Sequence, residues 1–223
     1  MRDAIFLSAS VPDPKRAPDF ASTADSVLIG AAVSALVHVI LGRRPLVWGG
    51  HPAITPMVWT VARDIGVDYG RWVRLYQSAH FKDEFPEDNE QFQNVVYTDD
   101  IEKNRRKSLF RMREQMFSEN SFSAAVFIGG MSGIIEEYDL FRHWQPDATV
   151  LPVVSTGGAT LSIADRMSDI PVELGRELDF VSAFHKSLGV SVREERFKRP
   201  EDQPLNIEDR YWHPPDEPSS PQP

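Results

Sequence analysis

Short apolar runs alternate with amphipathic segments along most of this chain. Each apolar run has the length of a buried strand, and each amphipathic segment repeats its apolar residues at helical spacing. We expect strands at residues 4–7, 45–48, 71–76, 94–98, 124–128 and 149–154, and helices at 22–41, 55–65, 99–120, 134–144, 159–167 and 180–188. This alternation predicts an α/β fold in which helices cover both faces of a doubly wound parallel sheet.

One segment, a predicted strand followed by a turn and a helix, organises the rest of the chain. Its apolar run ends in Gly129 and Gly130, and Gly133 follows. Glu136 and Glu137 stand in the first turn of the predicted helix. Such a turn exposes backbone N–H groups and the positive end of the helix dipole, which suits an anion such as a phosphate. We interpret it as one wall of a nucleotide pocket.

Three more turns of small residues follow predicted strands. They contain Ser8 and Ser10, then Gly49, Gly50 and His51, and finally Thr156, Gly157 and Gly158. Ligands of doubly wound sheets bind at the carboxyl ends of the strands, so we expect all four turns to share one edge of the sheet. For the first of these turns, an ordinary small-residue connection explains the sequence equally well.

The helix expected at 99–120 carries a cluster of positive charge. Its members are Arg105, Arg106, Lys107, Arg111 and Arg113. A charge run of this kind is usually a solvated helix face. The rest of the chain is acidic, so the cluster is also a candidate for balancing a ligand phosphate. Both interpretations stay open at this point.

Composition excludes several classes of function. The net charge of −9 argues against non-specific binding to nucleic acid or to anionic membranes. The absence of cysteine excludes a disulfide framework, a thiolate zinc site and a cysteine nucleophile. The six histidines show no metal-ligand spacing, and the most apolar long stretch, residues 27–41, is shorter than a membrane span. We expect a soluble, cytoplasmic protein with no metal site and no cofactor.

We divide the chain into a nucleotide-binding domain at residues 1–198 and a C-terminal tail at 199–223. The tail holds seven prolines, many charges and few aliphatic residues. Such a composition cannot bury a core of its own, so we expect the tail to be disordered. Tyr211 and Trp212 within it are candidates for docking on a partner or on the domain itself.

These motifs resemble the SLOG superfamily over residues 4–190. Its Rossmann-like domains include the LOG cytokinin-activating hydrolases, DprA-type DNA-processing proteins and the nucleotide-sensing domains of TRPM channels. Residues 46–50, with Met57 opening the next helix, are similar to the LOG segment L-V-Y-G-G-G followed by G-L-M. Residues 129–137 are similar to P-G-G-x-G-T-x-x-E. Residues 6–10 look like the family's first-strand loop, and 155–159 resemble a turn of the bacterial defence-associated branch.

The same resemblance implies counterparts of an arginine and a glutamate that LOG proteins carry. LOG proteins place an arginine about sixteen residues before the glycine pair, and here that residue is Arg113. The chain has Ile128 where LOG has proline, and it has one extra residue between its glycines. If Gly133 takes the position of the family's threonine, the family's glutamate corresponds to Glu136. Glu137 remains the alternative.

The resemblance implies two alternative functions. In the first, the protein senses a nucleotide or an NAD-derived ligand, such as a cyclic ADP-ribose, in a bacterial signalling or defence system. Arg113 would then pair with a phosphate and Glu136 would accept hydrogen bonds from ribose hydroxyls. In the second, the protein is an N-glycosidase or phosphoribohydrolase that releases a base from a nucleotide. Arg113 would orient the substrate, and Glu136 or Glu137 would stabilise an oxocarbenium-like state or activate water. A subunit with an inactive pocket is a third possibility.

Sites and partners follow from these alternatives. The residues that we expect to contact the ligand are Ser8, Ser10, Gly49, Gly50, His51, Arg113, Gly129, Gly130, Ser132, Gly133, Glu136, Thr156, Gly157 and Gly158. Backbone N–H groups in three of the glycine turns would hold phosphates. The resemblance implies a homo-oligomer, with a dimer as the default. The C-terminal tail is a candidate contact for an effector protein, and we expect no nucleic-acid or membrane partner.

Overall fold

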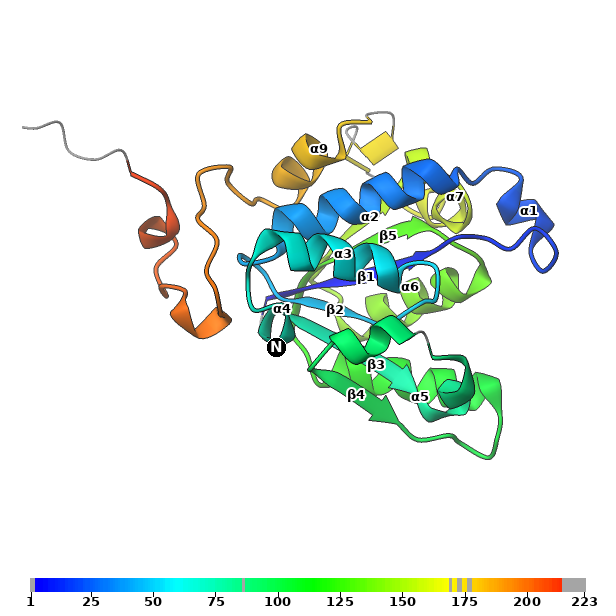
Figure 1. Cartoon of the computed structure of the whole chain (residues 1–223). Coiled ribbons are helices and arrows are strands. Elements are labelled where there is room, and N and C mark those ends of the chain that lie inside the picture. The colour runs from blue at the N-terminus through cyan, green and yellow to red at the C-terminus, as the bar shows by residue number, and fades with distance from the viewer. Residues whose placement is uncertain (1–2, 86, 169, 172–173, 176–177, 214–223) are drawn as a thin grey trace, which may run out of the picture.

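One six-stranded sheet forms the centre of the molecule (Figure 1). The computed structural model describes residues 3–85, 87–168, 170–171, 174–175 and 178–213. The strands are β1 Ala4–Ser10, β2 Leu46–Trp48, β3 Val73–Ser78, β4 Val95–Thr98, β5 Phe122–Gly129 and β6 Thr149–Val153. Their order is β4-β3-β2-β1-β5-β6, and each pair of neighbours is parallel. The predicted doubly wound parallel sheet is therefore confirmed.

Helices cover both faces of this sheet. The α-helices are α1 Pro18–Ala21, α2 Ser26–Ile40, α3 Thr55–Ile65, α4 Tyr69–Trp72, α5 Arg105–Ser118, α6 Ser132–Trp144, α7 Ala159–Ala164 and α9 Phe180–Ser187. Short 3-10 turns are η1 Ala79–Glu84, η2 Glu87–Gln91, η3 Val154–Thr156, η4 Pro200–Asp202 and η5 Glu208–Arg210. Buried residues of α2, α3 and α9 pack on one face, and those of α5, α6 and α7 pack on the other.

The apolar core lies on both sides of the central strand β1. Ile5 and Leu7 face the layer of α2 and α3, whereas Phe6 faces the layer of α5 and α6. Successive side chains of a strand point to opposite faces, which is why an unbroken apolar run marks a strand that is covered on both sides. Phe6 lies against Phe117 with ring centroids 5.0 Å apart and against Phe141 at 5.6 Å. These contacts fix α5 and α6 against the sheet.

Several predicted boundaries differ from the structure. Residues 71 and 72, expected in the third strand, belong to α4. α6 begins at Ser132, so Glu136 and Glu137 lie beyond its first turn.

β1 continues through Ser10, so Ser8 and Ser10 belong to the end of the strand and not to a turn. The helix expected from residue 99 begins only at Arg105, because Asn104 caps it and accepts a hydrogen bond from the N–H of Lys107 at 3.1 Å. Glu102 has a φ of 54°, a left-handed conformation that cannot continue a helix.

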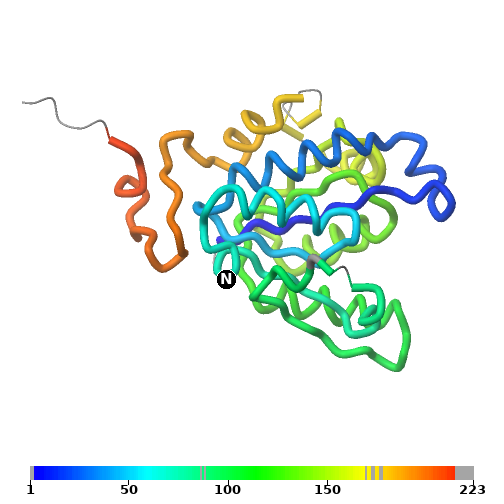
Figure 2. The backbone as a smooth tube through the Cα atoms, in the orientation of Figure 1, coloured from blue at the N-terminus to red at the C-terminus, as the bar shows by residue number. Residues whose placement is uncertain are grey.

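The segment after α9 packs at the end of the sheet opposite the carboxyl ends of the strands (Figure 2). Arg196 donates to the carbonyl oxygen of Leu41 at 2.6 Å, at the C-terminus of α2. The indole N–H of Trp72 contacts the carbonyl oxygens of Phe197 and Lys198, both at 3.1 Å. Of the tail expected from residue 199, residues 199–213 contain η4 and η5, and 214–223 lie outside the described residues.

No helix within the described ranges combines the length and the apolar character that crossing a membrane requires.

Candidate functional site

The turns after β1 and β5 meet at the point where the strand order reverses. Strands β2, β3 and β4 lie on one side of β1, and β5 and β6 lie on the other. Ser10 pairs in register with Gly129, and the N–H of Gly130 donates to the carbonyl oxygen of Ser10 at 2.8 Å. Doubly wound sheets open a crevice at this position, outside the carboxyl ends of the strands. The topology therefore brings two of the four predicted turns together.

Arg113 lies beside this crevice with its side chain only 6% exposed. Its Nε donates to Oε1 of Glu137 at 3.1 Å, and its Nη1 donates to Oε2 of Glu136 at 2.6 Å. Its Nη2 donates to the carbonyl oxygen of Gly133 at 3.1 Å. All three nitrogens of the guanidinium thus bond to the N-terminal half of α6. The arginine and both glutamates that the sequence selected lie in one cluster.

The two glutamates of this cluster face different surroundings. Glu137 is 18% exposed and accepts a hydrogen bond from Oγ of Ser8, on β1, at 2.6 Å. Glu136 is 57% exposed and lines a groove between α5 and α6. Glu137 is therefore the carboxylate that joins β1, α5 and α6 at the crevice. Ser8 orients it from one side and Arg113 from the other.

Several backbone donors of the glycine turns already have acceptors inside the protein. The N–H of Gly129 donates to Oγ1 of Thr156 at 2.9 Å, and the N–H of Gly158 donates to Oγ1 of Thr23 at 3.2 Å. The N–H of Gly157 donates to a carbonyl oxygen of its own turn at 3.0 Å. Within the described ranges, the N–H groups of residues 131–133, at the start of α6, have no acceptor. Those three groups are the open donors of this turn.

The turn after β6 serves mainly to join its neighbours. Gly157 has a φ of +67°, and a Cβ built there would lie 1.9 Å from the carbonyl oxygen of Thr23. The N–H of Asp25 donates to the carbonyl oxygen of Thr156 at 3.1 Å. Asp25 also caps α2, because its carboxylate accepts from the N–H groups of Val27 and Leu28. This turn therefore ties the start of α2 to the crevice.

The turn after β2 presents a histidine whose tautomer the structure defines. Gly50 has a φ of +67°, and a Cβ there would lie 1.9 Å from Nε2 of Gln77. Nδ1 of His51 accepts a hydrogen bond from the N–H of Ala53 at 3.2 Å, which places the ring proton on Nε2. Burial, and after it the charge of Arg16, lowers the pKa of His51 below its ordinary value of 6.5. His51 is thus a neutral donor at this edge.

The remaining cations of α5 occupy the solvated helix face that the charge run predicted. Arg111 pairs with Glu114 at 3.0 Å, and both side chains are well exposed. Lys107 pairs with Glu102. The guanidinium of Arg105 lies over a phenyl ring of η1. Arg113 differs from these neighbours because its side chain turns inward toward α6.

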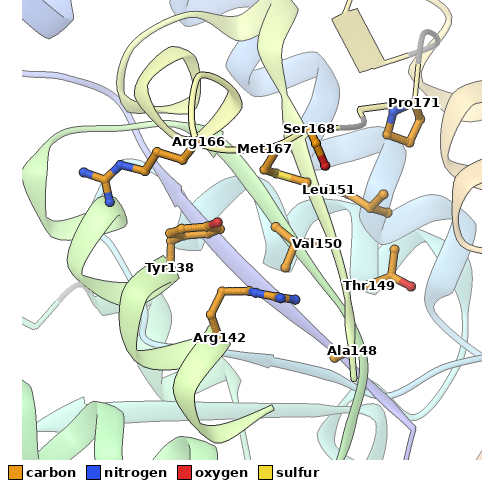
Figure 3. Close-up of a pocket in the computed structure, with 10 residues that line it drawn as sticks. All are labelled: Tyr138, Arg142, Ala148, Thr149, Val150, Leu151, Arg166, Met167, Ser168 and Pro171. Atoms are coloured by element: carbon orange, nitrogen blue, oxygen red, sulfur yellow. The ribbon is translucent and has the colours of Figure 1, made fainter. Parts of the chain in front are cut away.

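Two hollows lie on the α6 side of the molecule. The first, of about 820 Å³, runs between α5 and α6 and is lined by both Arg113 and Glu136. The second, of about 500 Å³, lies between α6, β6 and a segment that contributes residues 166–168 and Pro171 (Figure 3). Its Arg142 donates to the carbonyl oxygen of Pro146 at 3.2 Å, and its Arg166 pairs with Asp139 at 3.0 Å. The second hollow contains none of the predicted site residues.

Sequence reasoning missed Thr23, and it assigned Ser8 and Thr156 to ligand contact and not to holding the turns together. Thr23 and the hydroxyl of Thr156 fix the glycine turns, and Ser8 fixes Glu137. Their partners lie 27 to 135 residues away in the chain, so no local motif could have identified these pairs. In the part of the chain that the structure describes, no group of three or more histidines and carboxylates is arranged to hold a metal ion.

Comparison with known protein families matches residues 19–188 to one family, described as SLOG cluster3. The match begins after β1 and includes α5, α6 and three of the four turns. It confirms the superfamily indicated by the glycine and glutamate motifs. Comparisons with curated proteins and with solved structures give no match. Because the matched region covers well over half of the chain, the protein belongs to the SLOG cluster3 family.

Proposed function

We propose that this protein binds a nucleotide or an NAD-derived ligand, such as a cyclic ADP-ribose, and acts as a sensor in a bacterial signalling or defence system. Membership of a SLOG family supports the coarser part of this proposal, which is binding or processing of a nucleotide-related molecule. The identity of the ligand and the sensing role go beyond what family membership supports. They rest on the chemistry of the crevice between β1 and β5.

The observation that carries the proposal is the position of Glu137. Its carboxylate is held between Arg113 and Ser8 at the crevice, one turn from the unpaired N–H groups of residues 131–133. An oriented carboxylate accepts hydrogen bonds from the hydroxyls of a ribose, and free N–H groups at a helix N-terminus suit a phosphate. A sugar phosphate presents both kinds of group together.

Sensing is favoured over hydrolysis by the departures of the glycine turn from the LOG pattern, which are Ile128 and the extra residue between the glycines. Both hypotheses expect Arg113 to contact a ligand phosphate. All three of its guanidinium nitrogens contact Glu136, Glu137 or Gly133, so it has little remaining charge to offer a phosphate in either case. We therefore assign Arg113 to holding α6 and not to the phosphate.

Calorimetry with a panel of ligands tests the proposal. We expect AMP, ADP-ribose, NAD or a cyclic ADP-ribose to bind the full chain, and we expect mass spectrometry to recover the ligand unchanged. Glu137→Gln should weaken binding by about 10-fold, because an amide replaces one acceptor oxygen with a donor. Glu114→Gln, on the exposed face of α5, is the matched control. Absence of binding by every ligand in the panel contradicts the proposal.

The alternative function, N-glycosidic hydrolysis, makes a different prediction. The wild-type protein would release free base from a nucleoside monophosphate, and chromatography would detect the base. Arg113→Ala, Glu136→Ala and Glu137→Ala would each abolish that release if these residues orient the substrate and stabilise the oxocarbenium-like state. A ligand that binds but is recovered intact contradicts hydrolysis and supports sensing.

The same proposal includes a homodimer that forms across the groove between α5 and α6. Phe110 is 50% exposed on α5, and Leu140 lies across the groove on α6. Arg106 belongs to the α5 side and Asp139 to the α6 side. In a two-fold arrangement, α5 of each copy faces α6 of the other, so cations meet carboxylates twice. A second copy of the chain therefore complements this groove.

Sedimentation velocity tests the dimer. Phe110→Asp should convert a dimer into a monomer, because it places a charge in the apolar centre of the contact. Val181→Asp, at an exposed apolar position on α9, is the control and should leave the dimer intact. A wild-type chain that sediments as a monomer at high concentration contradicts this part of the proposal.

The C-terminal segment is proposed as the contact for an effector protein. Leu205 is almost fully exposed and Trp212 is half exposed, on a segment that lies at the other end of the sheet from the crevice. Exposed apolar side chains of this size are characteristic of recognition surfaces. A chain ending at residue 203 should keep its affinity for the ligand and lose the effector in a pull-down from the native host. Retention of every partner contradicts the proposal.

A further inference from the structure

A nucleotide phosphate needs a source of positive charge other than Arg113. That guanidinium is buried and bonded to two carboxylates, so the cluster of Arg113, Glu136 and Glu137 carries a formal charge of −1. The N–H groups at the start of α6 provide only the partial charge of a helix N-terminus. Tight phosphate binding normally uses at least one full positive charge with free donors.

The loops at the crevice offer few such groups. In the described loops that directly follow β1, β2, β5 and β6, the residues able to carry positive charge are Lys15, Arg16 and His51. Lys15 and Arg16 lie in the connection between β1 and α1, and His51 lies in the connection between β2 and α3. β1 and β2 are hydrogen-bonded neighbours in a parallel sheet, so both connections leave from the same edge. Figure 1 shows them at one end of the sheet.

Arg16 differs from Arg113 in its contacts. Its side chain is exposed, and its guanidinium has no hydrogen-bond or ion-pair partner among the described residues. The nearest carboxylate along the loop, Asp13, accepts a hydrogen bond from the backbone N–H of Lys15 at 2.8 Å. All five donors of Arg16 are therefore available to a ligand.

His51 complements Arg16 from the adjacent loop. Its Nδ1 is occupied by the N–H of Ala53, so Nε2 carries a proton that it can donate. The charge of Arg16 is near enough to contribute to the lowered pKa of this histidine. The guanidinium of Arg16 and the neutral imidazole of His51 can both donate hydrogen bonds to one anion from two adjacent loops. They do not repel each other because only the guanidinium is charged.

We propose that Arg16 and His51 form the anion-binding end of the crevice and hold the phosphate or pyrophosphate of the ligand. This inference deepens the proposed function and rests on it. Ser8, on the same strand that leads to Arg16, orients Glu137 toward the ribose. β1 and the loop that follows it thus serve both ends of the ligand. Ser8 of the strand positions Glu137 at the ribose, and Arg16 of the loop binds the phosphate.

Paired ligands and paired variants test this assignment. The full-length wild type, Arg16→Gln, Lys15→Gln and His51→Gln are titrated calorimetrically with AMP, adenosine, ADP-ribose and inorganic pyrophosphate. Lys15 is the matched control, because it is the neighbouring exposed cation and its replacement removes the same charge. Arg16→Gln should weaken AMP and ADP-ribose by about 10-fold or more and leave adenosine within about twofold. Lys15→Gln should change every affinity by less than about threefold.

The possible results separate this inference from the proposed function. If Arg16→Gln and Lys15→Gln have equal effects, or if Arg16→Gln weakens adenosine as much as AMP, the assignment of Arg16 is wrong while nucleotide binding stands. If the wild type binds pyrophosphate through Arg16 but binds no nucleoside or nucleotide, the anion site stands and the proposed function falls. If the wild type binds none of the four probes, both are overturned.

Discussion

Two arginine–glutamate clusters stand at opposite ends of the sheet, and they differ in which partner is buried. At the crevice, the arginine is buried: Arg113 is 6% exposed, whereas Glu136 is 57% exposed. At the C-terminal segment, the glutamate is buried: Glu194 is 1% exposed and accepts from both Nη1 and Nη2 of Arg44, at 2.6 and 3.1 Å. The first cluster therefore leaves a carboxylate facing solvent, and the second leaves none.

This difference suits the crevice cluster to the proposed ligand and the other cluster to attaching the C-terminal segment. Glu194 is satisfied on both oxygens, and its carbonyl oxygen also accepts from Nε of Arg43 at 2.6 Å. The neighbouring Arg196 donates to carbonyl oxygens at the end of α2, and burial lowers its pKa to about 10. The charged groups named at this end of the sheet all form hydrogen bonds or ion pairs within the chain. At the crevice, by contrast, Glu136 is 57% exposed, and the N–H groups of residues 131–133 have no acceptor among the described residues.

The largest expected effect comes from removing the buried arginine. Arg113→Met should lower the free energy of unfolding by about 3 kcal/mol, because it leaves Glu137 largely buried without a counter-charge. The exposed Glu136 adds little to this loss. Urea denaturation of the unliganded protein measures the effect.

The control for this change is a neighbour on the same helix. Arg111→Met breaks an exposed ion pair with Glu114 and should lower the free energy of unfolding by less than about 1 kcal/mol. Equal losses for the two variants would show that burial of Arg113 does not distinguish it. In that case Arg113 would contribute no more to stability than an exposed cation of the same helix.

Apolar periodicity predicted the fold because the strands are covered on both faces. Residues such as Ile5 and Phe6 are buried on opposite sides, so an unbroken apolar run identified β1. The start of α5 was misjudged because two acidic residues at 99–100 fit a first helical turn. Glu102 and Lys103 both have a φ of 54°, and neither residue type signals a left-handed conformation in the sequence.

The cluster of Arg113, Glu136 and Glu137 was predictable in its members and not in its contacts. The glycine turn and the spacing to Arg113 selected the residues that the structure brings together. The pairing of Arg113 with both glutamates depends on how α5 packs against α6, and that packing is set by buried aromatic residues such as Phe117 and Phe141. The hydrogen bond from Ser8 to Glu137 spans 129 residues of sequence, so only the sheet topology reveals it.

A smaller effect is expected at the other cluster. Glu194→Ala should lower the free energy of unfolding by about 2 kcal/mol, because Arg44 keeps partial access to water once its partner is gone. Ligand affinity should stay within about twofold of the wild type, since the change lies at the far end of the sheet. Calorimetry beside urea denaturation measures both quantities. A loss of ligand affinity well beyond about twofold would show that the two clusters are coupled.

The smallest effect is a dependence of stability on pH, and each end of the sheet contributes one histidine to it. Burial first, and Arg16 second, lowers the pKa of His51. Burial first, followed by Arg196 and Arg43, lowers the pKa of His38, which is the more exposed of the two. A lowered pKa means that the folded protein binds fewer protons than the unfolded chain as the pH falls below the ordinary value of 6.5.

The stability that these histidines contribute is therefore present above pH 6.5 and decreases as the pH falls through their folded-state pKa values. Thermal unfolding measured between about pH 7.5 and pH 5 should show this decline. His51→Gln should flatten it more than His38→Gln, because His51 is the more deeply buried and its charged form is the more strongly disfavoured. If the two variants flatten the curve equally, burial does not distinguish the histidine of the crevice from the histidine beside the C-terminal segment.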